Sequence, residues 1–199
     1  MSRIVIHPLF AAILSLAGVS GAGAPALAGT QYKETIRTEF APKVRAWAQS
    51  PDVILAVRRQ NEVHAGLSDA AIAKLDRKWR EETQSPARPM IDTVLGNALS
   101  DYLRQVQDKA QGFYTEIFVM DNRGLNVGQS NLTSDYWQGD EAKWQQTYQA
   151  GAGSILIDDV EFDESTQAFQ SQLSLPVVDP DTSEVIGAVT VGVNVGLFE

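Results

Sequence analysis

One polar connection in the chain concentrates side chains that are suited to binding a small molecule. The connection 131–152 contains the segment SDYWQGDEAKW. Tyr136 and Trp137 offer aromatic faces, while Asp140 and Lys143 offer charges, the mixture by which pockets orient small ligands. Connections of about twenty residues are uncommon in compact domains unless they are functional. We therefore predict that these four side chains contact a ligand carrying an amine, a carboxylate or both.

The same segment also has a structural interpretation. Asp140 is a good N-cap for a short helix that runs through Lys143 to Tyr148, and Trp144 is large enough to fill a core. A cavity filled by Trp137 and its neighbouring tyrosine would indicate a scaffold. An open cavity with convergent polar groups would indicate a binding protein.

Two more candidate ligand contacts lie in the turn after the first predicted strand. The guanidinium of Arg123 is able to hold a carboxylate through two hydrogen bonds. Asp121 begins this turn, where Asp side chains also accept hydrogen bonds from nearby backbone N–H groups. We include both residues in the predicted site, with a solvated Arg123 and a turn-ordering Asp121 as the alternatives.

Several kinds of chemistry are excluded by what the chain lacks. It has no cysteine, and His64 is the only histidine beyond the predicted leader, so neither a Ser-His-acid triad nor a Cys- or His-based zinc site is available. The acidic run 158–163 lacks the spacing of an EF-hand, so we interpret it as a solvent-exposed edge of the sheet. We expect no metal, no cofactor and no enzyme activity, with a carboxylate-based hydrolase as the formal exception.

The charge balance restricts the partners. The chain has 25 acidic and 16 basic residues and a net charge of -9. Such a surface repels phosphate backbones, so nucleic acid is not an expected partner.

Periodicity divides the chain into a helical first half and a strand-rich second half. We predict a helix over 32–49 that bends at Pro42, a second from Pro51 to about His64, and a third that Ser68 caps. A fourth, over 91–106, repeats apolar residues at helical spacing for more than four turns. Its residues Leu95, Leu99 and Leu103 are expected to be buried against a sheet.

The second half contains five predicted strands. They are expected at 116–121, 125–130, 154–162, 168–178 and 184–195. Asp179-Pro180-Asp181-Thr182 predicts a hairpin between the last two strands. Helices followed by an antiparallel sheet indicate an α+β domain.

Three segments resemble the Cache family, the PAS-like extracytoplasmic sensor domains of histidine kinases and chemoreceptors. They are FVMDNRGLNV at 118–127, the SDYWQGDEAKW segment, and IGAVTVGV at 186–193. The resemblance extends over about 32–195 and implies a single Cache domain: a PAS-like five-stranded antiparallel sheet with long N-terminal helices packed on it. It also implies a small-molecule ligand and a membrane receptor or kinase as partner. The amino-acid-binding pattern of the family does not match position by position, so the ligand class does not carry over.

The N-terminus has the features of a cleavable signal peptide. Arg3 precedes an apolar run at 9–19, and Ala26-Leu27-Ala28 fits the small-x-small cleavage rule. We expect residues 1–28 to be removed and 29–199 to form one periplasmic sensor domain that presents its ligand-bound state to a membrane signalling partner. A ligand-free scaffold on the same fold is the main alternative.

The cleavage site can be tested directly. N-terminal sequencing of the protein from a periplasmic fraction should begin at Gly29. Material in that fraction that still carries Met1 would contradict the signal-peptide prediction.

Overall fold

The computed structural model describes residues 25–164 and 166–198. The predicted signal peptide therefore lies mostly outside the described residues, and its predicted cleavage point falls within the first helix, α1 (Pro25–Thr35). Among the described residues, no helix combines the length and the apolar character needed to cross a membrane.

The predicted first helix is present as a continuous helical run with one irregular turn. α1 leads into a π-helical turn, Ile36–Phe40, and then into α2 (Ala41–Ala48). Pro42 has no backbone N–H and crowds the preceding turn, which explains why the wider turn occurs there. The expected bend at Pro42 thus takes the form of a π turn.

The next two helices begin at the predicted serines. α3 spans Pro51–His64 as expected, although the Ser50 side chain makes no capping hydrogen bond. α4 spans Asp69–Thr83, and the Ser68 hydroxyl accepts a hydrogen bond from the backbone N–H of Ala71 at 3.3 Å.

The prediction of one continuous helix over 91–106 is wrong. The chain forms α5 (Pro89–Leu95) and α6 (Ala98–Lys109), because the Asn97 side chain accepts a hydrogen bond from the Ser100 N–H at 2.8 Å and starts a new helix. Leu99 and Leu103 are buried as expected, whereas Leu95 is only half-buried and packs with a separate cluster around α4 and α5.

The strands form one antiparallel sheet. They are β1 (Tyr114–Met120), β2 (Asn126–Gln129), β3 (Leu156–Ile157), β4 (Glu161–Asp163), β5 (Ala168–Val178) and β6 (Val185–Asn194). The strand order is β2-β1-β6-β5-β3, and β4 pairs with another part of β5. The predicted third strand is thus broken into two short pieces along one edge, and the sheet has the five positions that the sequence predicts.

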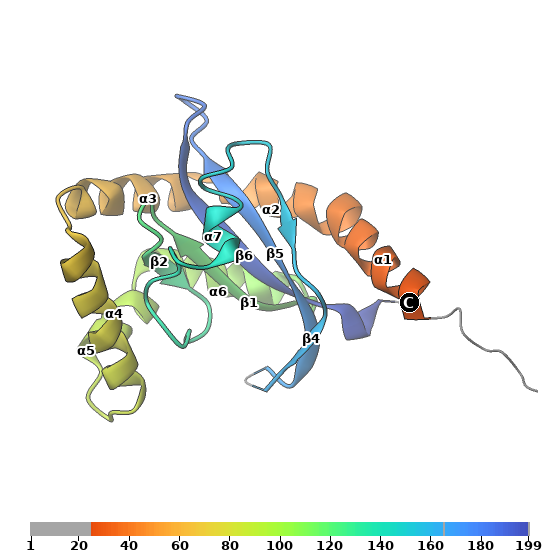
Figure 1. Cartoon of the computed structure of the whole chain (residues 1–199), viewed down its shortest axis with the longest axis horizontal. Helices are drawn as coiled ribbons and strands as arrows, with labels where there is room; N and C mark the ends of the chain where they lie inside the picture. The colour runs from red at the N-terminus through yellow and green to blue at the C-terminus, as the bar shows by residue number, and fades with distance from the viewer. Residues whose placement is uncertain (1–24, 165, 199) are drawn as a thin grey trace, which may run out of the picture.

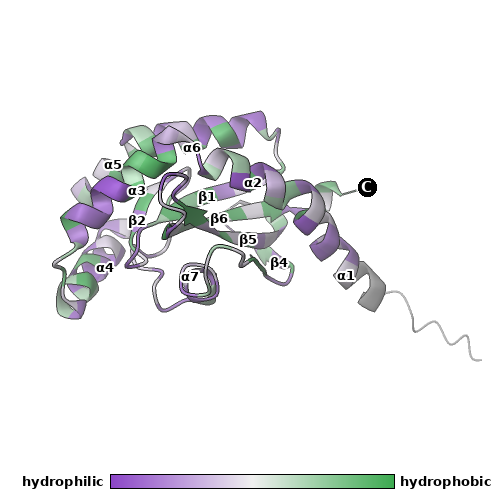
Figure 2. Cartoon of the chain, turned by 90° about the horizontal axis from the view of Figure 1, so that it is seen from above, coloured by the Kyte–Doolittle hydropathy of each residue, from purple (hydrophilic) through white to green (hydrophobic). Residues whose placement is uncertain are grey.

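The two faces of the sheet differ in chemistry. α2, α3 and α6 cover one face, and α7 (Ala142–Gln145) lies over the other (Figure 2). The helix-covered face holds the main apolar core, which includes Ile117, Leu173 and Val191. On the opposite face, alternate strand positions carry mostly polar side chains: Glu116, Gln170, Gln172, Ser174 and Thr190. The α+β class and the helical layer on an antiparallel sheet are therefore confirmed (Figure 1).

The division of the long helix predicts unequal costs for two leucine truncations. Leu103→Ala removes a fully buried side chain from the main core and should lower the free energy of unfolding by about 2–5 kcal/mol. Leu95→Ala, at a half-buried position in the separate cluster, should cost clearly less. Urea denaturation of both variants checks this, and equal losses would contradict the assignment of the two leucines to different clusters.

Candidate functional site

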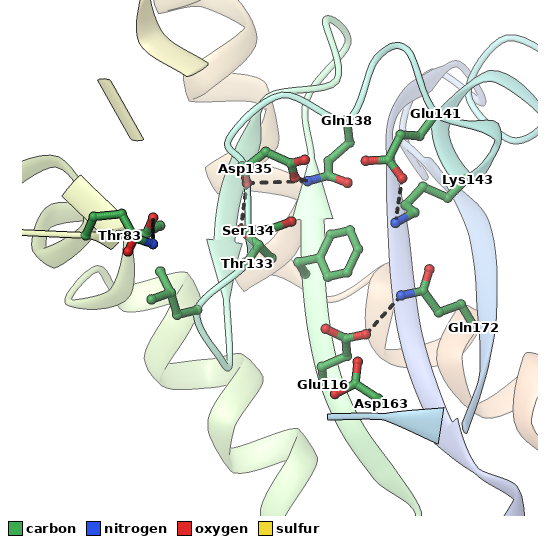
Figure 3. Close-up of a pocket in the computed structure, with 13 residues that line it drawn as sticks. Thr83, Glu116, Thr133, Ser134, Asp135, Gln138, Glu141, Lys143, Asp163 and Gln172 are labelled. Atoms are coloured by element: carbon green, nitrogen blue, oxygen red, sulfur yellow. Dashed lines mark hydrogen bonds and ion pairs between the residues drawn. The ribbon is translucent and has the colours of Figure 1, made fainter. Parts of the chain in front are cut away.

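A cavity of about 560 Å³ lies between the polar face of the sheet and the connection that follows β2. Figure 3 shows side chains from several parts of the chain converging on it. Its lining includes Glu116 and Phe118 from β1, Gln172 from β5, Asp135 and Gln138 from the connection, Lys143 from α7, and Asp163 from β4. The cavity is thus open, and most of the groups around it are polar.

Glu116 is the carboxylate on the cavity's sheet wall. Its Oε1 accepts hydrogen bonds from Gln172 Nε2 at 2.9 Å and from Gln170 Nε2 at 3.1 Å. The same Gln170 amide donates to Asp163 Oδ2 at 3.1 Å, so one side chain connects the two carboxylates. Burial raises the pKa of Glu116 above the usual carboxyl range, against the opposing influence of these amides and of Lys143.

Lys143 is the only basic side chain among the described residues that line the cavity. Its Nζ pairs with Glu141 at 2.8 Å and lies 5.5 Å from the centre of the Phe118 ring, close enough for a cation–π contact. Its charge is therefore already offset by a neighbouring carboxylate.

Asp135 contributes a further carboxylate at the connection. It accepts a hydrogen bond from the Gln138 amide and lies 3.5 Å from Arg80 of α4. Burial, followed by the nearby Glu141, raises the pKa of Asp135. Counted together, the lining carboxylates outnumber the single lysine by four to one: Glu116, Asp135, Glu141 and Asp163.

The connection forms a fixed wall. Asp76 of α4 accepts hydrogen bonds from the backbone N–H groups of Tyr136 and Trp137 at 3.0 and 3.1 Å. Trp79 of the same helix donates its indole N–H to the Thr133 carbonyl at 3.0 Å. Trp137 also forms an antiparallel bridge with Leu125. The first half of the connection therefore extends the edge of the sheet, and α4 holds it there.

The two predicted aromatic contacts face away from the cavity into this wall. Tyr136 is buried and stacks on Trp79 with ring centres 5.4 Å apart. Trp137 donates its indole N–H to the Arg123 carbonyl at 2.8 Å and packs against Gly139, where an added Cβ would lie 2.4 Å from the indole nitrogen. Neither lines the cavity, and neither fills it. Their role as ligand contacts stays a prediction.

Asp140 is exposed and also lies outside the cavity lining. The helix expected to run through Lys143 to Tyr148 is shorter, as α7, and its N-cap lies one residue later than predicted, so the predicted cap at Asp140 is wrong. Glu141 is the N-cap residue, and its side chain makes no capping hydrogen bond. Trp144 is buried under α7, as the structural interpretation expects.

Asp121 and Arg123 occupy the β1–β2 turn, away from the cavity. Asp121 is fully buried and its Oδ1 accepts hydrogen bonds from the backbone N–H groups of Arg123 and Leu125 at 2.8 and 2.9 Å. Its Oδ2 lies 2.7 Å from His64 Nδ1. Arg123 pairs with exposed Asp69 at 3.3 Å. Asp121 therefore orders its own turn, and Arg123 lies at the surface in an ion pair, which are the alternatives to ligand contact that the sequence analysis gave.

The structure brings only Lys143 of the six predicted residues to the cavity, and it adds residues that the sequence analysis missed. Glu116 and Phe118 lie within a strand interpreted as an apolar run, although their alternation with buried Ile117 and Val119 places them on the opposite face. The sequence pattern that could have identified this polar face is the run of polar residues at alternate positions of β5: Gln170, Gln172 and Ser174.

The acidic run after β3 does not form a metal site in the part of the chain that the structure describes. There, no group of three or more His, Cys, Asp or Glu side chains is placed to hold an ion. Asp159 instead pairs with Lys33 of α1 at 2.7 Å, and this pairing lowers the pKa of Asp159.

Comparison with known proteins gives similarity at the level of the fold only. No protein-family model matches the chain, and no curated protein is significantly similar to it in sequence. The sensor domain of the V. cholerae histidine kinase DctB is 17% identical, with a TM-score of 0.36, over 82% of this chain and 57% of that chain.

Two chemoreceptor domains give similar values. The sensory domain of Campylobacter jejuni Tlp3 with isoleucine bound is 11% identical, with a TM-score of 0.38, over 86% of this chain and 64% of that chain. The ligand-binding domain of the Pseudomonas aeruginosa amino-acid chemoreceptor PctC, in complex with GABA, is 12% identical, with a TM-score of 0.39, over 71% and 57%. The chain spans less than two thirds of the length of each of these structures.

The packing of the connection predicts opposite outcomes for two of its residues. Trp137→Ala should lower the free energy of unfolding by about 3 kcal/mol, because it removes an indole that packs on the β1–β2 turn and donates to it. Asp140→Ala should change it by less than about 0.5 kcal/mol, as expected for an exposed side chain. Chemical denaturation measures both, and a larger loss for Asp140→Ala would show that this residue has a structural role.

Proposed function

We propose that this protein is a ligand-binding sensor module that takes a small molecule carrying a protonated amine into the cavity on the polar face of its sheet. Its bound state would be presented to a membrane receptor or kinase in the periplasm. The carboxylate surplus of the cavity is the observation that carries the ligand class.

The charges of the cavity favour a cation. Lys143 is paired with Glu141, and Asp135 lies 3.5 Å from Arg80, so Glu116 is the lining carboxylate on which the preference for a cation rests. Glu116 forms no ion pair with any described side chain and is held by two amides. A partly buried carboxylate without a cation is costly, and an ammonium group of a ligand would offset that cost.

The size and composition of the cavity suit a small ligand. Its volume of about 560 Å³ falls in the usual range for small-molecule pockets. The Phe118 ring adds an apolar surface among the acids, and the amides of Gln138 and Gln172 offer directed hydrogen bonds. A short amine or zwitterion matches this set better than a dicarboxylate does.

The scaffold alternative is less well supported. It requires that Tyr136 and Trp137 fill the space beneath the connection, whereas Tyr136 stacks on Trp79 and Trp137 lies against the β1–β2 turn. Space therefore remains over the polar face for a ligand.

The cavity is also joined to the helical layer by a short series of contacts. Trp144, next to Lys143 in α7, donates its indole N–H to the Asp121 carbonyl at 3.1 Å. The side chain of Asp121 in turn accepts from Gln60 and His64 of α3. This series offers a route by which occupancy of the cavity would reach the outer helices.

One feature favours a second candidate, a carboxylate-based hydrolase. Glu116 and Asp163 are both bonded to Gln170, and burial raises the pKa of Glu116, as hydrolases that use an acid and a carboxylate require. Glycoside hydrolysis by the purified protein that is lost in both Glu116→Gln and Asp163→Asn would establish this candidate in place of the sensor.

Four-carbon probes that differ only in their end groups test the ligand class. Putrescine carries two amines, γ-aminobutyrate one amine and one carboxylate, and succinate two carboxylates. Putrescine and γ-aminobutyrate should raise the melting temperature, since a ligand at a hundred times its Kd stabilises the native state by about 2.7 kcal/mol. Succinate should not. Stabilisation by succinate alone would contradict the proposal.

Glu116→Gln should change stability and binding in opposite directions. Because burial raises the pKa of Glu116, the ionised side chain destabilises the free protein above that pKa and has no such effect at acidic pH, where it is protonated. The glutamine variant should therefore be more stable than the wild type at neutral pH, equally stable at acidic pH, and no longer stabilised by the amines.

Glu39→Gln, at an exposed position in the π-helical turn Ile36–Phe40, is the matched control. It should leave both stability and the amine response unchanged. A Glu116→Gln protein that is more stable yet keeps its full amine response would place the binding site elsewhere.

A further inference from the structure

A second cleft, of about 470 Å³, opens on the other side of the molecule, between α2, α6 and the start of β1. Its walls are mainly aromatic: Phe40, Trp47, Tyr102, Phe113 and Tyr114. The ring centre of Phe40 lies 5.7 Å from that of Phe113 and 6.2 Å from that of Tyr114, both at tilted angles. Figure 2 shows that α2 and α6 lie on the face of the sheet opposite α7. The cleft shares no lining residue with the acidic cavity, so the two are separate.

Trp47 differs from the other three tryptophans in its indole N–H. The indole nitrogens of Trp79, Trp137 and Trp144 each donate to a backbone carbonyl, at 3.0, 2.8 and 3.1 Å. The Trp47 Nε1 is buried and has no hydrogen bond of normal geometry among the described residues, although the Tyr114 hydroxyl is close enough to interact with it electrostatically. A buried donor without an acceptor is costly, so an acceptor supplied by a ligand would stabilise it.

The charge around the cleft has the opposite sign to that of the whole protein. Lys43 and Lys109 line it, both are exposed, and neither forms an ion pair with a described residue. No acidic side chain belongs to the described lining, although the chain carries a net charge of -9. Lys43 lies 5.4 Å from the centre of the Phe40 ring, so one cation already stands at the aromatic wall.

We propose that this cleft is a second binding site, for an aromatic carboxylate. The ring of the ligand would pack among the aromatic side chains, which favour offset or edge-to-face contacts with another ring. Its carboxylate would lie beside Lys43 and Lys109 and accept the hydrogen of the Trp47 indole, whose buried N–H would have to turn toward the cleft. The protein would then have two sites of opposite charge preference, one on each side of its sheet.

The indole N–H signals in a nitrogen–proton NMR spectrum report on this site directly, with phenylacetate as the probe. Trp47→Phe removes one signal and so identifies it. Phenylacetate should move the Trp47 signal downfield as its N–H gains an acceptor, while the signals of Trp79, Trp137 and Trp144, whose N–H groups are already bonded, should stay in place. No movement of the Trp47 signal, or an equal movement of all four, would overturn the proposal.

Probes and variants that differ in charge test the role of the lysines. Phenylacetamide, which is neutral, should bind about tenfold more weakly than phenylacetate, as loss of a charge-assisted hydrogen bond implies. Phenethylamine should not bind at the cleft. The double variant Lys43→Glu with Lys109→Glu should lose phenylacetate binding by a similar or larger factor, and both positions are exposed, so the fold should be kept.

The controls separate this site from general charge effects and from the acidic cavity. Lys74→Glu changes the charge by the same amount per residue at an exposed position on α4 and should leave phenylacetate binding intact. Glu116→Gln should also leave it intact, because that residue belongs to the other cavity. Unchanged binding in the Lys43 and Lys109 double variant, or equal affinity for phenylacetate and its amide, would refute the proposed carboxylate site.

Discussion

The buried carboxylate of Asp121 is the constraint on which the arrangement of the site depends. It is fully buried, and N–H groups from two parts of the chain point at it: the backbone of its own turn, and Gln60 and His64 at the end of α3. A carboxylate surrounded in this way favours keeping each donor in place, because moving any of them removes one of the hydrogen bonds that offset the burial of the charge. The turn and α3 are therefore held together at the edge of the sheet.

From this turn the constraint extends to the wall of the acidic cavity. The Asp121 carbonyl accepts from the Trp144 indole, which fixes α7, and the Arg123 carbonyl accepts from the Trp137 indole, which fixes the connection. Gly124 has a φ of +80°, and a Cβ there would lie 2.5 Å from Gly139, so the turn and the connection approach more closely than another residue would permit. The cavity wall is thus preorganised by the same turn that holds α3.

Much of the fold follows from local patterns in the sequence, while the site does not. α3 and β5 begin and end at the predicted residues because their signals, a proline at the helix start and the Asp179–Thr182 turn after the strand, act over a few residues. The division between α5 and α6 is missed because Asn97 interrupts an apolar pattern that continues on both sides of it. Tyr136 and Trp137 are chosen for their chemistry, but their orientation is set by Trp79 and Asp76, some sixty residues earlier.

The polar face of the sheet explains why a cavity exists at all. Gly192 leaves room for the Thr115 hydroxyl and the Gln170 amide, since a Cβ at this position would lie 2.2 Å from the first and 2.5 Å from the second. Those groups hydrogen-bond to each other and, through Gln170, to Glu116. An apolar residue at 192 would bury more surface but would displace this network and the carboxylate it positions. The face therefore lacks packing that would stabilise the sheet, and it holds hydrogen-bonding groups in fixed positions around the cavity.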